Sequence, residues 1–344
     1  MKQGSIVHQT LEDQVHTTVH VDVQTKEDAW GLRIWNVIQG LRTLRDTGQT
    51  RELEVWGTID GLVVNGVIDE ISYVCPDSKL EEAIEKSCPQ PEVLSDQPTI
   101  SEFFKATADS RSIDAKKIKR SHGTHKIYLC DVKTRGVKTL PAENAFKPTK
   151  MQLMIYHKLL SALGTNTVDF SALTTRYGLD STKMFSDEFI AQVGSLNDEV
   201  FYDELSIPDA SQDSVNQRSQ DSMTTLLAHN SLSALWSLMI EEFKITLPDG
   251  ADSLGNILKA EYRSRDNGQV LGSKTFAMDQ VGLQIYLHRE MQWWKGEREP
   301  QGVIVEEAFK CRSCDFAETC EWRLKKVDEA KDKFRMAKKR ISAI

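Results

Sequence analysis

Two short apolar segments of the sequence contain side chains that could bind a metal ion. Residues 66–71 contain Asp69, and residues 127–134 contain Asp131, followed two positions later by Lys133. Because side chains alternate between the two faces of a strand, Asp131 and Lys133 point to the same face. If the two segments pair in one sheet, two carboxylates and one ammonium group converge. Carboxylate oxygens are the ligands that Mg²⁺ and Mn²⁺ prefer, so the pattern predicts a hydrolytic metal site.

An acid placed two residues before a lysine is a weak signal by itself. The spacing occurs at Asp77, Asp114, Asp131, Glu242 and Glu329. A solvated charge pair is the ordinary interpretation of such a spacing. Asp131 differs from the others because an apolar strand leads directly into it.

Flanking motifs make the interpretation specific, because their order along the chain is that of RecB-type nucleases. The motifs are Gly4-x3-His8, Gly66-Val67-Ile68-Asp69, Asp131-Val132-Lys133 and Gln152-x3-Tyr156, followed by Cys311-x2-Cys314-x5-Cys320 near the C-terminus. Together they resemble the exonuclease V family, in its fungal-type form, over residues 1 to about 325.

The resemblance implies an α/β fold of the restriction-endonuclease-like, PD-(D/E)xK type. Such a fold has a mixed central sheet flanked by helices, here with a C-terminal cysteine clasp. The implied activity is metal-dependent hydrolysis of single-stranded DNA by an exonuclease, in DNA repair or mitochondrial genome maintenance. Two alternatives stay open: a catalytically inactive DNA-binding protein that retains the fold, and a zinc-stabilised interaction module.

The resemblance also implies roles for individual side chains. Asp69 and Asp131 would hold Mg²⁺ or Mn²⁺ with help from His8, and Lys133 would position the attacking water. Gln152 and Tyr156, which lie one helical turn apart, would support the lysine and the DNA end. A structural histidine and ordinary amphipathic packing of the tyrosine are the alternatives for His8 and Tyr156.

The three C-terminal cysteines supply soft ligands within ten residues. Such a set suits zinc or an iron–sulfur cluster, and the spacing alone does not separate them. The resemblance implies a [4Fe–4S] cluster held by Cys311, Cys314 and Cys320. In the family the fourth cysteine lies upstream of the Gly-x3-His motif, whereas here no cysteine precedes Gly4. Either the natural N-terminus is missing, or another residue serves, or no cluster forms.

The net charge of −8 argues against a general nucleic-acid binder, but the charge is uneven. Residues 115–126 carry only basic charges, which predicts a DNA-facing segment at Lys116, Lys117, Lys119 and Arg120. A solvated loop is the alternative. Basic residues also dominate 322–344, where a polar terminal helix is the alternative to a phosphate-binding surface.

We expect one nuclease domain over residues 1–325, with an insertion at 76–125, an acidic loop at 195–222 and a basic C-terminal helix or tail at 326–344. Hydrophobic periodicity predicts helices over 5–16, 28–45, 79–87, 148–163, 223–247 and 280–295. Alternating residues predict hairpins over 52–74, with a turn at Asn65-Gly66, and over 256–277.

No apolar run reaches 18 residues, so no membrane span is expected. The sequence shows no apolar signal region, and the six cysteines have no regular disulfide spacing. We therefore expect an intracellular, non-secreted protein of the mitochondrion or nucleus. It would act as a monomer on single-stranded DNA, with a single-strand-binding protein as a partner.

Overall fold

The computed structural model describes residues 7, 10–11, 21–87, 126–195, 222–299 and 301–341. The chain forms two compact units. One comprises Met1–Leu140 with Pro148–Gln280, and the other Pro141–Lys147 with Val281–Ile344.

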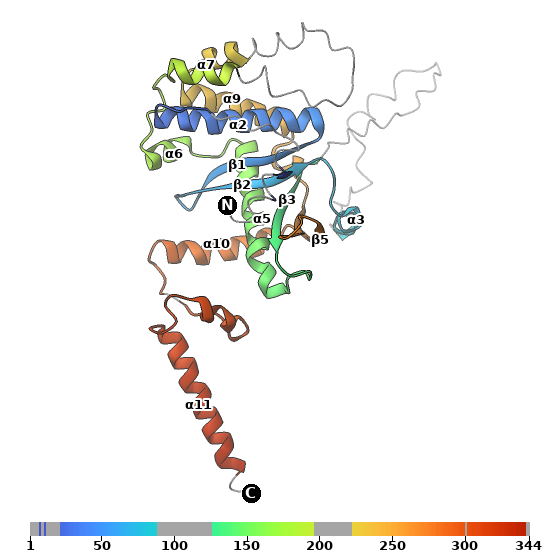
Figure 1. Cartoon of the computed structure of the whole chain (residues 1–344), viewed down its shortest axis with the longest axis vertical. Coiled ribbons are helices and arrows are strands. Elements are labelled where there is room, and N and C mark those ends of the chain that lie inside the picture. The colour runs from blue at the N-terminus through green and yellow to red at the C-terminus, as the bar shows by residue number, and fades with distance from the viewer. Residues whose placement is uncertain are drawn as a thin grey trace, which may run out of the picture. The chain divides into compact units, whose positions relative to one another are not determined.

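The larger unit is built on a five-stranded sheet with the strand order β1-β2-β3-β4-β5 (Figure 1). The pairing of β3 with β4 is parallel, and the other three pairings are antiparallel. The predicted α/β fold with a mixed central sheet is therefore confirmed. The strands are β1 (Gln49–Ile59), β2 (Leu62–Ser72), β3 (Tyr128–Arg135), β4 (Ile257–Ser264) and β5 (Val270–Ala277).

The turn between β1 and β2 lies at Asp60-Gly61, so the predicted turn at Asn65-Gly66 is wrong. Asp60 and Gly61 have φ values of 53° and 80°, as a tight hairpin turn requires. Asn65 instead pairs with Trp56 in the middle of the ladder. Both dipeptides carry the same local turn signal, and the long ladder between β1 and β2 forms only with the earlier one.

Helix α2 (Lys26–Thr47) extends the helix predicted at 28–45 by two residues at each end. Thr25 and Asp28 form a capping box at its start, and Gly48 ends it with a φ of 87°. The short helix α3 (Ser78–Ser87) matches the helix predicted over 79–87. Figure 1 shows α2 beside α9 (Leu232–Thr246), and α2 also packs on β1.

Helix α5 (Glu143–Gly164) begins before Pro148, where the sequence predicts its start. The predicted helix over 223–247 is two helices, one over residues 222–228 and the other α9. Ser231 breaks the run because its side chain caps α9 by accepting a hydrogen bond from the Ala234 amide. The same unit contains α6 (Phe170–Tyr177), α7 (Asp187–Ser195) and the 3₁₀ helix η2 (Gly250–Ser253).

The smaller unit contains α10 (Gln280–Trp294), the 3₁₀ helix η3 (Val305–Ser313) and α11 (Glu321–Ile341). The prediction of a helix over 280–295 matches α10. Across the ranges that the structure describes, no helix has the length and apolar character needed to cross a membrane.

Candidate active site

The two carboxylates predicted from the sequence lie where β2 and β3 separate. The strands pair through Ser72↔Tyr128, Ile71↔Leu129 and Glu70↔Cys130, and the ladder ends there. Asp69 and Asp131 are the next residues on each strand. Beyond the ladder, the Asp69 Oδ2 accepts a hydrogen bond of 2.6 Å from the Val132 backbone amide. A side chain thus takes the place of a backbone partner, and both carboxylates lie at the opening of a fork.

The side-chain alternation of β2 changes at Asp69. Ile68 and Ile71 are both fully buried, although residues three apart point to opposite faces in a regular strand. Asp69 stands opposite Glu52, which is missing from the paired register and has a φ of 52°. A non-glycine residue in this conformation marks a local irregularity. This irregularity allows the Asp69 carboxylate to turn toward β3.

Asp131 and Lys133 form a close pair on β3. Asp131 is only 1% exposed, and the Lys133 Nζ lies 2.9 Å from its Oδ1. Burial acts to lower the pKa of Lys133, but the charge and hydrogen bond of Asp131, with smaller contributions from Asp69 and Tyr156, raise it above its ordinary value. The ammonium group is therefore held in its charged form between the carboxylates and the tyrosine.

Helix α5 brings Gln152 and Tyr156 to the same site. The Gln152 Nε2 donates a hydrogen bond of 2.8 Å to the Tyr156 hydroxyl. The ring of Tyr156 lies against Gly66 of β2, where an added Cβ would come within 2.3 Å of the ring. Both residues of the Gln-x3-Tyr motif are thus placed together, with the tyrosine beside the catalytic lysine predicted from the sequence.

Tyr262 of β4 forms the neighbouring surface, and sequence reasoning missed it. It pairs with Lys133 across the parallel strands and is 3% exposed. Burial raises the pKa of its phenol, a hydrogen bond with the Thr149 side chain lowers it, and the Asp131 charge raises it. The only signal in the sequence was that Tyr262 is an aromatic residue in the hairpin predicted over 256–277.

The oxygen donors at the fork suit a hard divalent cation. Mg²⁺ is commonly bound through one or two carboxylates, with water and substrate phosphates completing its shell. Asp69 and Asp131 supply such a set. In the parts of the chain that the structure describes, no three His, Cys, Asp or Glu side chains group so as to hold a metal ion. His8 lies outside those residues.

The three clasp cysteines all lie in the smaller unit. Cys311 is in η3, and Cys314 and Cys320 lie between η3 and α11. They are not in disulfides, and a cluster held by them stays a prediction. Of the cysteines in the larger unit, Cys75 and Cys130 both have thiol pKa values raised, mainly by burial.

The basic segment predicted to face DNA lies outside the described residues. Lys116, Lys117, Lys119 and Arg120 are all within 88–125. The predicted acidic loop also falls almost wholly outside them, at 196–221. Their proposed roles therefore stay predictions.

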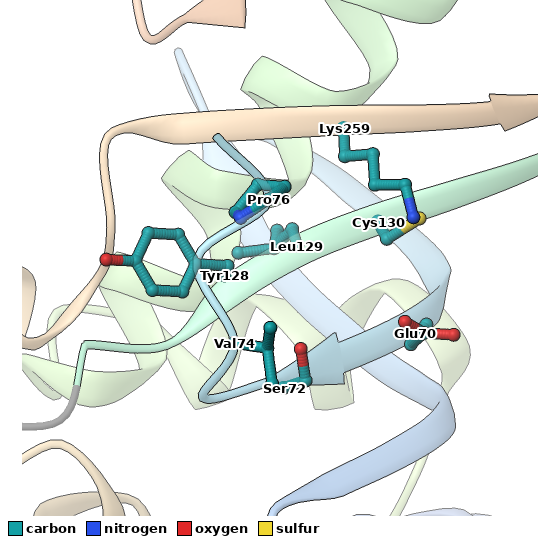
Figure 2. Close-up of a pocket in the computed structure, with 8 residues that line it drawn as sticks. All are labelled: Glu70, Ser72, Val74, Pro76, Tyr128, Leu129, Cys130 and Lys259. Carbon is teal, nitrogen blue, oxygen red and sulfur yellow. The ribbon is translucent and has the colours of Figure 1, made fainter. Parts of the chain in front are cut away.

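A small pocket of about 90 Å³ opens on the other face of the sheet (Figure 2). Glu70, Cys130 and Lys259 line it from three adjacent strands, where they are paired in register. Cys130 and Asp131 are consecutive on β3, so their side chains point to opposite faces. The pocket is therefore separate from the Asp131–Lys133 pair.

Comparisons with known proteins agree with the resemblance seen in the motifs. A family model described as "Exonuclease V - a 5' deoxyribonuclease" matches residues 1–323. Exonuclease V of Danio rerio is 22% identical over 321 residues, which are 93% of this chain and 61% of that protein. A protein of Candida dubliniensis, "Exonuclease V, mitochondrial", is 29% identical over 69 residues, or 20% of this chain and 11% of that protein. The chain thus spans about three fifths of the length of the Danio relative.

Proposed function

The chain belongs to the exonuclease V family, and we propose that it is a deoxyribonuclease that removes nucleotides from the ends of single-stranded DNA with the help of a divalent metal ion. The observation that carries this proposal is the fork between β2 and β3. It gathers Asp69, Asp131 and Lys133 with the Asp69 carboxylate bonded to the Val132 amide and Lys133 bonded to Asp131.

In this proposal Asp69 and Asp131 hold Mg²⁺ or Mn²⁺, the Val132 carbonyl lends a further oxygen, and His8 assists. The bound ion supplies an activated water and neutralises charge on the phosphate. Lys133 brings a fixed positive charge to the place where the phosphate oxygens gain charge, and orients the attacking water.

The residues of α5 act by position. The Gln152 amide holds the Tyr156 hydroxyl, and the tyrosine contributes to the electrostatic surroundings of Lys133. Lys133, hydrogen-bonded to Asp131, would keep its ammonium group at one place while the substrate strand moves through the site. Pre-placed charge of this kind costs no reorganisation during the reaction.

Other features of the proposal extend beyond the fork. Cys311, Cys314 and Cys320 would hold a [4Fe–4S] cluster with a fourth ligand from elsewhere, and the basic residues Lys116, Lys117, Lys119 and Arg120 would contact DNA. We propose one nuclease domain over 1–325 with a basic C-terminal helix, acting as a monomer in the mitochondrion or the nucleus, with a single-strand-binding protein as a partner.

The test is cleavage of end-labelled single-stranded and double-stranded DNA by the purified protein, with and without Mg²⁺. Wild-type protein should shorten the single strand only when the metal ion is present. Asp69→Ala, Asp131→Ala and Lys133→Ala should each abolish cleavage while the protein stays folded. Asp60→Ala is the matched control because Asp60 is an exposed aspartate in the turn between β1 and β2.

Two outcomes would contradict the proposal. Cleavage by Asp131→Ala at the wild-type rate would show that the fork is not the catalytic site. Binding of DNA without any cleavage, in every metal tested, would favour an inactive DNA-binding protein that retains the fold.

A further inference from the structure

Arg135 lies on the same face of β3 as the predicted catalytic residues. Asp131, Lys133 and Arg135 are spaced two apart, and the pairing of β3 with β4 is regular through Arg135↔Ser264. Their side chains therefore point to one face. The Arg135 guanidinium lies 5.8 Å from the centre of the Tyr262 ring, the ring that pairs across the strands with Lys133. This contact fixes Arg135 beside the fork.

Arg135 differs from two other arginines of the sheet in having no carboxylate partner among the residues that the structure describes. Arg51 pairs with Glu70, and Arg263 pairs with Glu261. For Arg135, no described residue offers a carboxylate within ion-pair distance. Its Nε is buried without a hydrogen bond, as is the Nε of Arg51, but the charge of Arg51 is paired. The guanidinium of Arg135 lies beside the predicted reaction site without a carboxylate, so it is available to a ligand that supplies acceptor oxygens.

The charge and shape of the group indicate what that ligand is. A guanidinium group matches the oxygens of a phosphate, with which it forms two parallel hydrogen bonds. Two residues of a strand advance about 6.6 Å, which is comparable with the spacing between successive phosphates of an extended DNA strand. If one phosphate of the DNA lies at Lys133 and the metal ion, the next phosphate along the DNA strand reaches Arg135.

Arg265 adds a second cation at the same end of β3. Its backbone amide donates a hydrogen bond of 2.8 Å to the Arg135 carbonyl. Its guanidinium lies against Gly136, where an added Cβ would come within 2.3 Å of a terminal nitrogen. The end of the catalytic strand is therefore cationic, although the whole chain carries a net charge of −8.

We propose that Arg135 binds the phosphodiester group adjacent to the one that is cleaved, and that Tyr262 holds the guanidinium for this contact. The inference rests on the proposed function of the fork. It adds a residue that positions the substrate strand, without assigning Arg135 any part in the chemical step.

The experiment measures binding of a fluorescein-labelled oligothymidine in EDTA, where cleavage is stopped, at several salt concentrations. Arg135→Gln should weaken binding about ten- to a hundredfold, as expected for loss of a charged hydrogen-bonded contact. It should also reduce the salt dependence by about 0.7 in log–log slope, the value for one phosphate contact on a single strand. Arg135→Lys should recover part of the affinity.

Arg263→Gln is the matched control. It removes the same charge from the adjacent strand, but Arg263 pairs with Glu261 on the other face. Its affinity and salt slope should equal those of the wild type. Circular dichroism and urea unfolding check that each variant is folded.

A second measurement replaces single phosphates of the oligonucleotide by neutral methylphosphonates, one position at a time. In the wild type, one replacement should weaken binding as much as Arg135→Gln does. In the Arg135→Gln protein, the same replacement should have little further effect, because the contact is already lost.

The outcomes separate this inference from the proposed function. Equal affinities and slopes for the wild type and Arg135→Gln, or additive effects at every methylphosphonate position, would overturn the Arg135 assignment while normal cleavage left the proposed function intact. Wild-type protein that neither binds nor cleaves DNA would overturn both.

Discussion

Gly66→Ala should displace Tyr156 and slow cleavage, although it adds only one methyl group. The new Cβ would lie 2.3 Å from Tyr156 Cε1, 2.9 Å from Cζ and 3.0 Å from the hydroxyl oxygen. Ordinary contacts begin near 3.4 Å, so the ring must move by about 1 Å. Overpacking of this kind costs about 1–3 kcal/mol of stability, and a shift of about 1 Å in a site can lower a rate about a hundredfold.

The assay compares kcat and KM on a single-stranded oligonucleotide with the free energy of unfolding in urea. Gly57→Ala is the matched control because Gly57 lies on the adjacent strand β1 and faces the same helix. Its new Cβ would meet the Leu159 Cδ2 at 2.7 Å, which is the movable end of an aliphatic side chain. We expect both variants to lose stability, and only Gly66→Ala to lose kcat.

A double variant tests whether the effect passes through the ring. In a Tyr156→Ala background the ring is gone, so Gly66→Ala should cause little further loss of kcat. Wild-type kcat in folded Gly66→Ala protein would refute the reasoning. So would an equal loss of kcat in Gly57→Ala, because the cause would then be general packing between the sheet and α5.

Two further predictions concern stability and metal content. His157 is 4% exposed, and burial lowers its pKa from 6.5 to about 4. The imidazole of His157 therefore binds a proton more tightly in the unfolded chain than in the folded protein. The free energy of unfolding should therefore fall by about 3 kcal/mol between pH 6.5 and pH 4, and urea titrations of His157→Gln should show a smaller fall; equal falls would contradict this. Protein that holds the [4Fe–4S] cluster should contain about four iron and four sulfide per chain and absorb visible light. The Cys311→Ser variant should lose the iron and sulfide together with the visible absorption. Zinc in a one-to-one ratio to the chain would exclude the cluster.

The sequence predicted the strand that carries Asp131 and Lys133 because the signal there is local. The pairing of this strand with the Asp69 segment was a condition of the metal-site prediction, and the structure shows that pairing. Asp131 ends a run of apolar, β-branched and aromatic residues, and its neighbour two positions on must share its face. The parallel placement of β3 beside β4 joins residues far apart in the chain, such as Lys133 and Tyr262. No periodicity reports such a pairing, so Tyr262 could not be assigned to the site.

The predicted position of the hairpin turn was wrong for a related reason. Asp60-Gly61 and Asn65-Gly66 are equally good turn sequences, and only contacts beyond the hairpin separate them. The Tyr156 ring needs the space at Gly66. A glycine that looked like a turn residue is therefore a contact residue for a distant helix. The local signal was real, but tertiary packing decided its use.

The charge balance at the fork explains how an acidic chain could bind DNA there. Asp69 and Asp131 together offset Lys133 and Arg135, so these four side chains carry no net charge until a cation is bound. A divalent ion would then add two positive charges at the carboxylates and make the fork attractive to phosphate. DNA affinity should therefore depend strongly on the metal ion near the scissile phosphate. Arg135, which has no carboxylate partner among the described residues, would supply the attraction that remains without it, which is why its contribution is clearest in EDTA.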